Sequence, residues 1–128
     1  MTTKITDGVQ VSVESFFQAE HSSPANHHFV FSYKIRIHNH SHDTIQLLRR
    51  HWFIYDSNGV VREVEGEGVI GLQPFIIAGD YYEYVSGCNF RTEIGKMKGT
   101  YTMLRMSDDS EFKVIIPQFT MITPYKLN

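Results

Sequence analysis

The segment from residue 29 to residue 38 alternates apolar and polar side chains without interruption. One side of an extended chain would carry Phe29, Phe31, Tyr33, Ile35 and Ile37, and the other side would carry mostly polar residues. A period of two residues is typical of a β-strand that buries one face. The chain is therefore constrained to form a sheet that packs one face against a core.

The same pattern recurs along the chain. Alternating or continuous apolar runs predict strands at residues 9–17, 29–38, 45–55, 60–65, 81–88, 100–106 and 111–116, the first with a bulge at Phe16–Phe17. Hairpin turns are expected at residues 56–59, which contain Asn58-Gly59, and at residues 107–110. No apolar stripe of helical period persists. The predicted fold class is all-β, a fibronectin type III/immunoglobulin-like antiparallel β-sandwich of about seven or eight strands.

The length and the cysteine content refine this prediction. The 128 residues are expected to form one domain, 1–128, with a short mobile N-terminus at about 1–8 and a C-terminal tail at about 118–128 that packs on an edge. The single cysteine, Cys88, cannot form an internal disulfide. This favours the disulfide-free, fibronectin-like variant and a reducing compartment, so we expect a cytoplasmic protein.

The balance of charged residues limits the kinds of partner that we expect. Twelve Lys and Arg against fourteen Asp and Glu give a net charge of -2, which argues against a DNA-binding face. No signal peptide and no apolar run of about 18 residues is present, so membrane insertion is not expected. Sandwich edges often pair, so a homodimer stays open.

Residues 66–71 match the letters of the dinucleotide-binding fingerprint, Gly-x-Gly-x-x-Gly. That motif requires a helix to begin at its third glycine, whereas Pro74 follows Gly71 closely and no helical pattern appears. Two interpretations remain: a crossover loop that needs unusual backbone angles, which is favoured, and an anion-binding loop. The residues of the anion-binding hypothesis are Gly66, Gly68, Gly71, Arg50 and Arg62.

All seven histidines lie between His21 and His51. His38, His40 and His42 occupy alternate positions, so on a continued strand they would share one face and could bind a transition metal. The turn-forming residues between them favour solvated loop histidines instead. No cofactor is expected. Glu63, Glu65 and Glu67 also alternate, which is typical of a solvated strand face. The alternative is that they bind a hard cation together with Asp80 or Glu83 from another strand.

Aromatic residues concentrate on two strands, and half of each strand must face away from the core. Exposed aromatic side chains are typical of binding surfaces. The residues of this interaction-surface hypothesis are His51, Trp52, Tyr81, Tyr82 and Tyr84. The sequence contains no recognisable catalytic motif, such as Gly-x-Ser-x-Gly, so we expect no enzymatic activity.

Several segments in order resemble the ApaG family. They include Asn39 and Ser41, Arg50-His51-Trp52, residues 64–71 and residues 95–99, and the likeness spans nearly the whole chain. The resemblance implies a fibronectin type III-like sandwich. It also implies a genetic association with cobalt and magnesium efflux or resistance, a link to diadenosine tetraphosphate metabolism, and related domains in larger proteins that look like partner-binding modules.

These observations lead to three ranked hypotheses. The first is a non-enzymatic protein-interaction module with an unknown protein partner, indirectly associated with cobalt/magnesium resistance. The second is an anion-binding domain for pyrophosphate or a nucleotide polyphosphate at residues 66–71. The third is divalent-cation binding.

Overall fold

The computed structural model describes residues 1–127, and about two-thirds of these residues lie in β-strands. Nine strands appear in chain order: β1 (Thr2–Thr6), β2 (Val9–Phe17), β3 (Phe29–Asn39), β4 (Ile45–Asp56), β5 (Val61–Glu67), β6 (Phe75–Ile76), β7 (Tyr81–Phe90), β8 (Ile94–Arg105) and β9 (Ser110–Ile122). Three 3-10 turns complete the described chain: η1 (Ala19–His21), η2 (Pro24–Asn26) and η3 (Pro124–Leu127).

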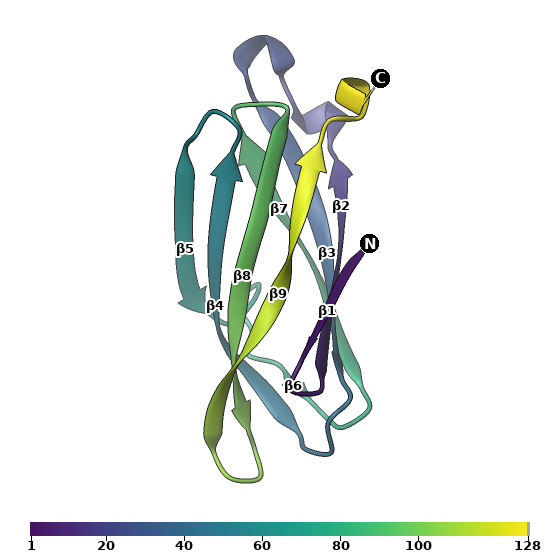
Figure 1. Ribbon diagram of the computed structural model, residues 1–128, viewed down its shortest axis with the longest axis vertical. Helices are drawn as coiled ribbons and strands as arrows, with labels where there is room; N and C mark the ends of the chain where they lie inside the picture. The colour runs from purple at the N-terminus through teal and green to yellow at the C-terminus, as the bar shows by residue number, and fades with distance from the viewer. Residues whose placement is uncertain (128) are drawn as a thin grey trace.

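The strands form two antiparallel sheets packed face to face, as the sequence predicted. One sheet has the order β1-β2-β3-β7, and the other has the order β5-β4-β8-β9, with the short β6 also paired to β4. Figure 1 shows the second sheet in front of β3 and β7. The all-β antiparallel sandwich is confirmed, and its arrangement is consistent with a fibronectin type III-like domain.

The core lies between the two sheets and is built by the predicted alternation. The side chains of β3 that point inward, from Phe29 to Ile37, are all at most 5% exposed. They pack against inward residues of β4, β8 and β9, among them Trp52, Tyr101 and Phe119. Close packing of these large side chains supplies most of the stability of such a domain.

Three expectations about strand boundaries need correction. The N-terminus is ordered, because Thr2–Thr6 form β1 and pair along β2. The pairing of β2 with β3 runs without a shift to Phe17, so no bulge occurs at Phe16–Phe17. Finally, β9 does not end before Pro117 but continues to Ile122, and the bulge in the β8–β9 pairing lies near Gly99. The part of the tail up to Ile122 is therefore an edge strand with core side chains.

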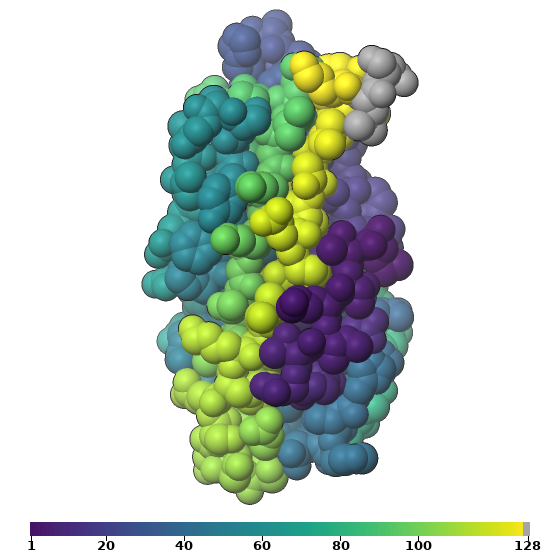
Figure 2. All heavy atoms as spheres, in the orientation of Figure 1, coloured from purple at the N-terminus to yellow at the C-terminus, as the bar shows by residue number. Residues whose placement is uncertain are grey.

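The two open sides of the sandwich differ. On one side β1 lies against β9 (Figure 2). The backbone N–H of Ile115 in β9 donates to the hydroxyl of Thr6 in β1. On the other side β5 pairs only with β4 among the described strands. All but one of the β5 residues are exposed. The sandwich is therefore closed along β1 and β9 but presents β5 as an accessible edge.

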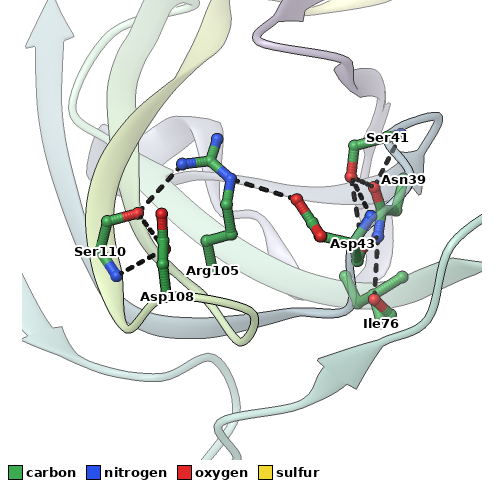
Figure 3. A network of polar contacts seen from close by, with 7 residues as sticks. All are labelled: Asn39, Ser41, Asp43, Ile76, Arg105, Asp108 and Ser110. Atoms are coloured by element: carbon green, nitrogen blue, oxygen red, sulfur yellow. Dashed lines mark hydrogen bonds and ion pairs between the residues drawn. The ribbon is translucent and has the colours of Figure 1, made fainter.

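A buried asparagine fixes the lower loops of the sandwich. The amide of Asn39 donates to the carbonyls of Asp43 and Ile76, and its side-chain oxygen accepts from the backbone and the hydroxyl of Ser41 (Figure 3). Each of these four contacts is 2.6–3.0 Å long. Because Asn39 is fully buried and fully bonded, we assign it and Ser41 a structural role.

Candidate functional site on the outer face of the second sheet

A break in the alternation of β4 determines which side chains face the solvent. The pairing of β4 with β8 shifts between Leu47 and Arg49, and after this bulge Trp52 and Ile54 point into the core. Because side chains alternate along a strand, the residues at positions 51, 53 and 55 point outward. His51, Phe53 and Tyr55 form a row of three rings on the outer face, each half-buried by its neighbours. We call these three residues the ring row.

Basic side chains of β8 lie directly beside the ring row. Lys98 is the register partner of Phe53, and Lys96 is the partner of Tyr55. The ammonium groups of Lys96 and Lys98 lie 5.1 and 5.6 Å from the centre of the Tyr55 ring, within the range of cation–π attraction. The row therefore combines apolar ring surface with a positive rim on the β8 side.

Three hollows follow the ring row along this face. The first, about 310 Å³, is lined by His51 together with Arg49 and Lys113. The second, about 350 Å³, includes Phe53 and Lys98 in its lining, and the third, about 210 Å³, includes Tyr55 and Lys96. The outer face of the second sheet is thus indented next to each ring, which is the shape that receives side chains of a partner.

On the β5 side, two carboxylates flank His51. The Nδ1 atom of His51 lies 3.2 Å from Oε1 of Glu65, and its Nε2 atom lies 3.3 Å from Oε2 of Glu63. The ring packs on Phe53, with 4.6 Å between ring centres. Of the described residues, only His51, Glu63 and Glu65 form a group of potential metal ligands whose ligand atoms all lie within 4.8 Å of one another.

The structure places His51 and Tyr81 on outer faces, as the interaction-surface hypothesis requires, but it buries two other residues of that hypothesis. Trp52 is 3% exposed and Tyr84 is 8% exposed, so neither can contribute to a surface. Tyr82 is partly buried and packs against the core. Tyr81 does face outward from β7, where the Arg36 guanidinium covers its ring at 4.1 Å. The outward rings that the hypothesis missed are Phe53 and Tyr55.

The inward tyrosines form a polar contact inside the core. The hydroxyls of Tyr84 and Tyr101 are hydrogen-bonded to each other between the sheets. Burial raises the pKa of both phenols, and most strongly so at Tyr101. Both groups therefore stay protonated at neutral pH and have a structural role.

The structure does not bring all the predicted anion-binding residues together. Gly66 and Arg50 line the same hollow as Lys113, but Arg62 points to β7, where it donates to the carbonyl of Asn89. Arg62 also contacts the thiol of Cys88, whose pKa is raised chiefly by burial, so Cys88 remains a protonated thiol.

The glycine loop is held by its own hydrogen bonds. The N–H groups of Gly68, Val69 and Leu72 donate to backbone carbonyls. The guanidinium of Arg50 donates to the carbonyls of Glu67 and Gly68, both at 3.0 Å. Positive φ angles at Gly68, Ile70 and Gly71 agree with the unusual backbone angles of the favoured interpretation. The loop is not a crossover between sheets, however, because β5 and β6 on its two sides both pair with β4.

The three alternating histidines lie at the end of β3 and in the following turn. His38 contacts the carbonyl of Gly79, and His40 contacts the side chain of Gln10 at 2.8 Å. The rings of His38 and His40 stack, whereas His42 is separately exposed on the turn. These histidines are not among the ligand groupings found in the described part of the chain, so the structure gives the metal hypothesis at this position no geometric support.

By its fold, this protein is an antiparallel two-sheet β-sandwich domain that carries the ring row on one outer face. The chain belongs to the ApaG family: the model of the ApaG domain matches residues 19–105. Protein ApaG of Paramagnetospirillum magneticum is 44% identical over 98% of this chain and 96% of its own length. Protein ApaG of Anaeromyxobacter dehalogenans is 42% identical over the full length of both chains. The crystal structure of a Bordetella pertussis protein named ApaA superposes with a TM-score of 0.88 and 39% identity, covering 91% of this chain and 94% of that one.

The resemblance found in the sequence is therefore confirmed. No helix among the described residues is both long and apolar enough to cross a membrane.

Proposed function

We propose that this domain is a non-enzymatic protein-interaction module that binds its partner on the outer face of the β5-β4-β8-β9 sheet. The observation that carries the proposal is the ring row of His51, Phe53 and Tyr55, which stands on the central strand β4 beside three hollows. Aromatic side chains in indented surfaces are the usual anchors of protein interfaces.

The charges around the ring row indicate the kind of partner. Lys96, Lys98 and Lys113 supply positive charge on the β8 and β9 side. A partner that presents an apolar side chain to Phe53, with acidic residues beside it, would match this face. Any part in cobalt or magnesium resistance, which the family resemblance implies, would act through that partner.

The test is capture of a partner from a bacterial lysate by immobilised wild-type and variant domains. The double variant Phe53→Ser/Tyr55→Ser removes two anchors, and we expect it to retain less than about one tenth of the partner, because anchor residues commonly contribute 2 kcal/mol or more. The matched control is Val85→Ser, which removes an exposed apolar side chain from the outer face of the other sheet. Circular dichroism verifies that both variants fold. Equal capture by both variants would contradict the proposal.

A second candidate function is binding of pyrophosphate or a nucleotide polyphosphate. Its support is the hollow lined by Arg49, Arg50, Gly66 and Lys113. Titration calorimetry with pyrophosphate tests it, using Lys113→Ala to remove charge. Gly68→Ala is unsuitable as a variant, because its Cβ atom would lie 2.1 Å from the carbonyl oxygen of Leu72 and distort the loop. Absence of heat at millimolar pyrophosphate would exclude this function.

A further inference from the structure

His51 is the one residue of the ring row that has a buried polar atom without a hydrogen bond. Its Nε2 atom is shielded from solvent and makes no hydrogen bond, although the carboxylate of Glu63 lies 3.3 Å away. The other ring nitrogen lies 3.2 Å from Glu65. Buried polar atoms in proteins almost always have a partner. The close but misaligned contact therefore needs an explanation.

A neutral imidazole cannot satisfy both carboxylates. It carries one N–H group, so its other nitrogen presents a lone pair toward a carboxylate oxygen. At most one carboxylate can accept the N–H of His51, and the carboxylate at the other nitrogen then faces a lone pair, which is a repulsive contact. A cation bound to the nitrogen that lacks the proton would replace this repulsive contact by ligand bonds to that nitrogen and to the carboxylates.

We propose that His51, Glu63 and Glu65 bind one divalent cation of the zinc class. One imidazole nitrogen and two carboxylate oxygens are a common donor set for Zn²⁺. Tetrahedral bonds of about 2.0–2.1 Å place ligand atoms roughly 3.3 Å apart. The grouping of ligand atoms within 4.8 Å needs only small side-chain movements to reach this geometry. Water would fill the fourth position.

The strand pairing places the three residues of this site next to one another, and the imidazole is held in place. The β4–β5 hairpin sets Glu65 directly opposite His51 and Glu63 opposite Phe53. Phe53 packs on the imidazole ring and restricts its rotation. The carboxylates are more than half exposed, so an ion can enter from solvent and the glutamates can adjust. A rigid imidazole with two mobile carboxylates is a site that an ion can complete.

A bound cation would also attach β5, the open edge strand of the sandwich, more firmly to β4. Among the described strands β5 pairs only with β4, and its residues are largely exposed. An ion shared by β4 and β5 would add a cross-strand connection in the middle of this hairpin. Because binding to the native state stabilises a protein, thermal stability should rise with Zn²⁺ concentration. The inference rests on the ligand geometry and does not depend on the partner proposed above.

The experiment is calorimetric titration of the purified domain with Zn²⁺, with Mg²⁺ in a parallel arm. We expect one saturable Zn²⁺ site per chain. His51→Gln and Glu65→Gln should each weaken it at least roughly tenfold, because each removes a direct ligand. The matched control is His42→Gln, which removes an exposed histidine from the β3–β4 turn and should leave the affinity unchanged.

Four outcomes would overturn the proposal. These are absence of a saturable site at millimolar Zn²⁺, affinity within twofold of the wild type in His51→Gln, loss of binding in His42→Gln, and tighter binding of Mg²⁺ than of Zn²⁺. Thermal unfolding provides a second readout: Zn²⁺ should raise the midpoint of the wild type and of His42→Gln, but not that of His51→Gln. Circular dichroism establishes that each variant is folded before titration.

Discussion

The outer faces of the two sheets differ in how their polar side chains are satisfied. On the β1-β2-β3-β7 sheet, Glu83 contacts Lys34 at 2.9 Å and Arg36 at 2.7 Å, and Arg36 also covers the ring of Tyr81. On the β5-β4-β8-β9 sheet, the ring row stands between lysines and glutamates, and His51 keeps an unpartnered nitrogen. When the charged side chains of a face are already paired with one another, few charged groups remain free to bind a partner. The face with unsatisfied groups is therefore the better candidate for binding.

The first prediction concerns a glycine beneath the ring row, and it has the largest expected effect. A Cβ atom at Gly99 would lie 2.2 Å from the carbonyl oxygen of His51, and both groups belong to paired strands that cannot move apart. We expect Gly99→Ala to lower the free energy of unfolding by about 3 kcal/mol. The matched change on the other sheet is Gly87→Ala, whose Cβ would meet only Phe31 oxygen at 3.5 Å.

Urea denaturation measures both variants. Gly87→Ala should stay within about 0.5 kcal/mol of the wild type. Equal effects at the two glycines would show that β8 does not pack closely against the backbone of His51 at Gly99.

The second prediction concerns the hydroxyl pair that joins the two sheets. Tyr101→Phe leaves the Tyr84 hydroxyl without a partner in the core, which should cost about 1–3 kcal/mol. Tyr84→Phe/Tyr101→Phe removes both hydroxyls, so its cost should be smaller than the sum of the single changes. A double-mutant cycle in urea measures the coupling. Strict additivity would mean that the two hydroxyls do not interact.

The third prediction follows from the raised pKa of the same two phenols. Tyrosine ionises near pH 10 in the unfolded chain, whereas burial raises the pKa of Tyr84 and Tyr101 in the folded protein. Above about pH 10 the unfolded state therefore binds fewer protons than the native state, and stability falls as pH rises. Each phenol contributes a slope of up to about 1.4 kcal/mol per pH unit.

Urea midpoints between pH 8 and pH 11 measure this slope. It should be shallower in Tyr84→Phe/Tyr101→Phe than in the wild type, and unchanged in Tyr81→Phe, which alters an exposed ring. An unchanged slope in the double variant would assign the alkaline loss of stability to other groups.

The fourth prediction has the smallest effect and concerns the ion pairs of the first sheet. Hydrogen bonds from Lys34 and Arg36 lower the pKa of Glu83. Its contribution to stability is therefore present at neutral pH and lost as pH falls through the lowered pKa. Because Lys34 and Arg36 are exposed and Glu83 is only half-buried, Glu83→Gln should change the thermal midpoint only slightly at pH 7. This difference should vanish in acid, and a difference that persists there would mean that the carboxylate acts through packing.

The alternation of apolar residues was sufficient to predict the sandwich, because each period-two run maps directly onto a strand with one buried face. Boundaries were harder to predict. Pro117 was interpreted as the end of the last strand, but the bulge near Gly99 lets β9 continue through it and bury Phe119 and Met121. A bulge depends on pairing between strands, which no single segment reveals.

The candidate site was only partly visible in the sequence. The β4 bulge between Leu47 and Arg49 decides that Trp52 points inward and that His51 points outward, and it has no clear local signature. The grouping of His51 with Glu63 and Glu65, in contrast, could have been predicted from the sequence. A hairpin turn at Asn58-Gly59 pairs Tyr55 with Val61, and counting back places His51 opposite Glu65. Using the turn to fix the register would have found the group.

The comparison between the two outer faces can be tested most directly by crosslinking. A photoreactive amino acid replaces Lys98 beside the ring row in one variant, and Lys34 on the other outer face in a second variant. Both positions are lysines on sheet faces, so the two variants are matched. After irradiation in living cells, we expect the partner to be crosslinked at position 98 at least about tenfold more than at position 34. Equal yields, or a higher yield at position 34, would contradict the assignment of the binding face to the second sheet.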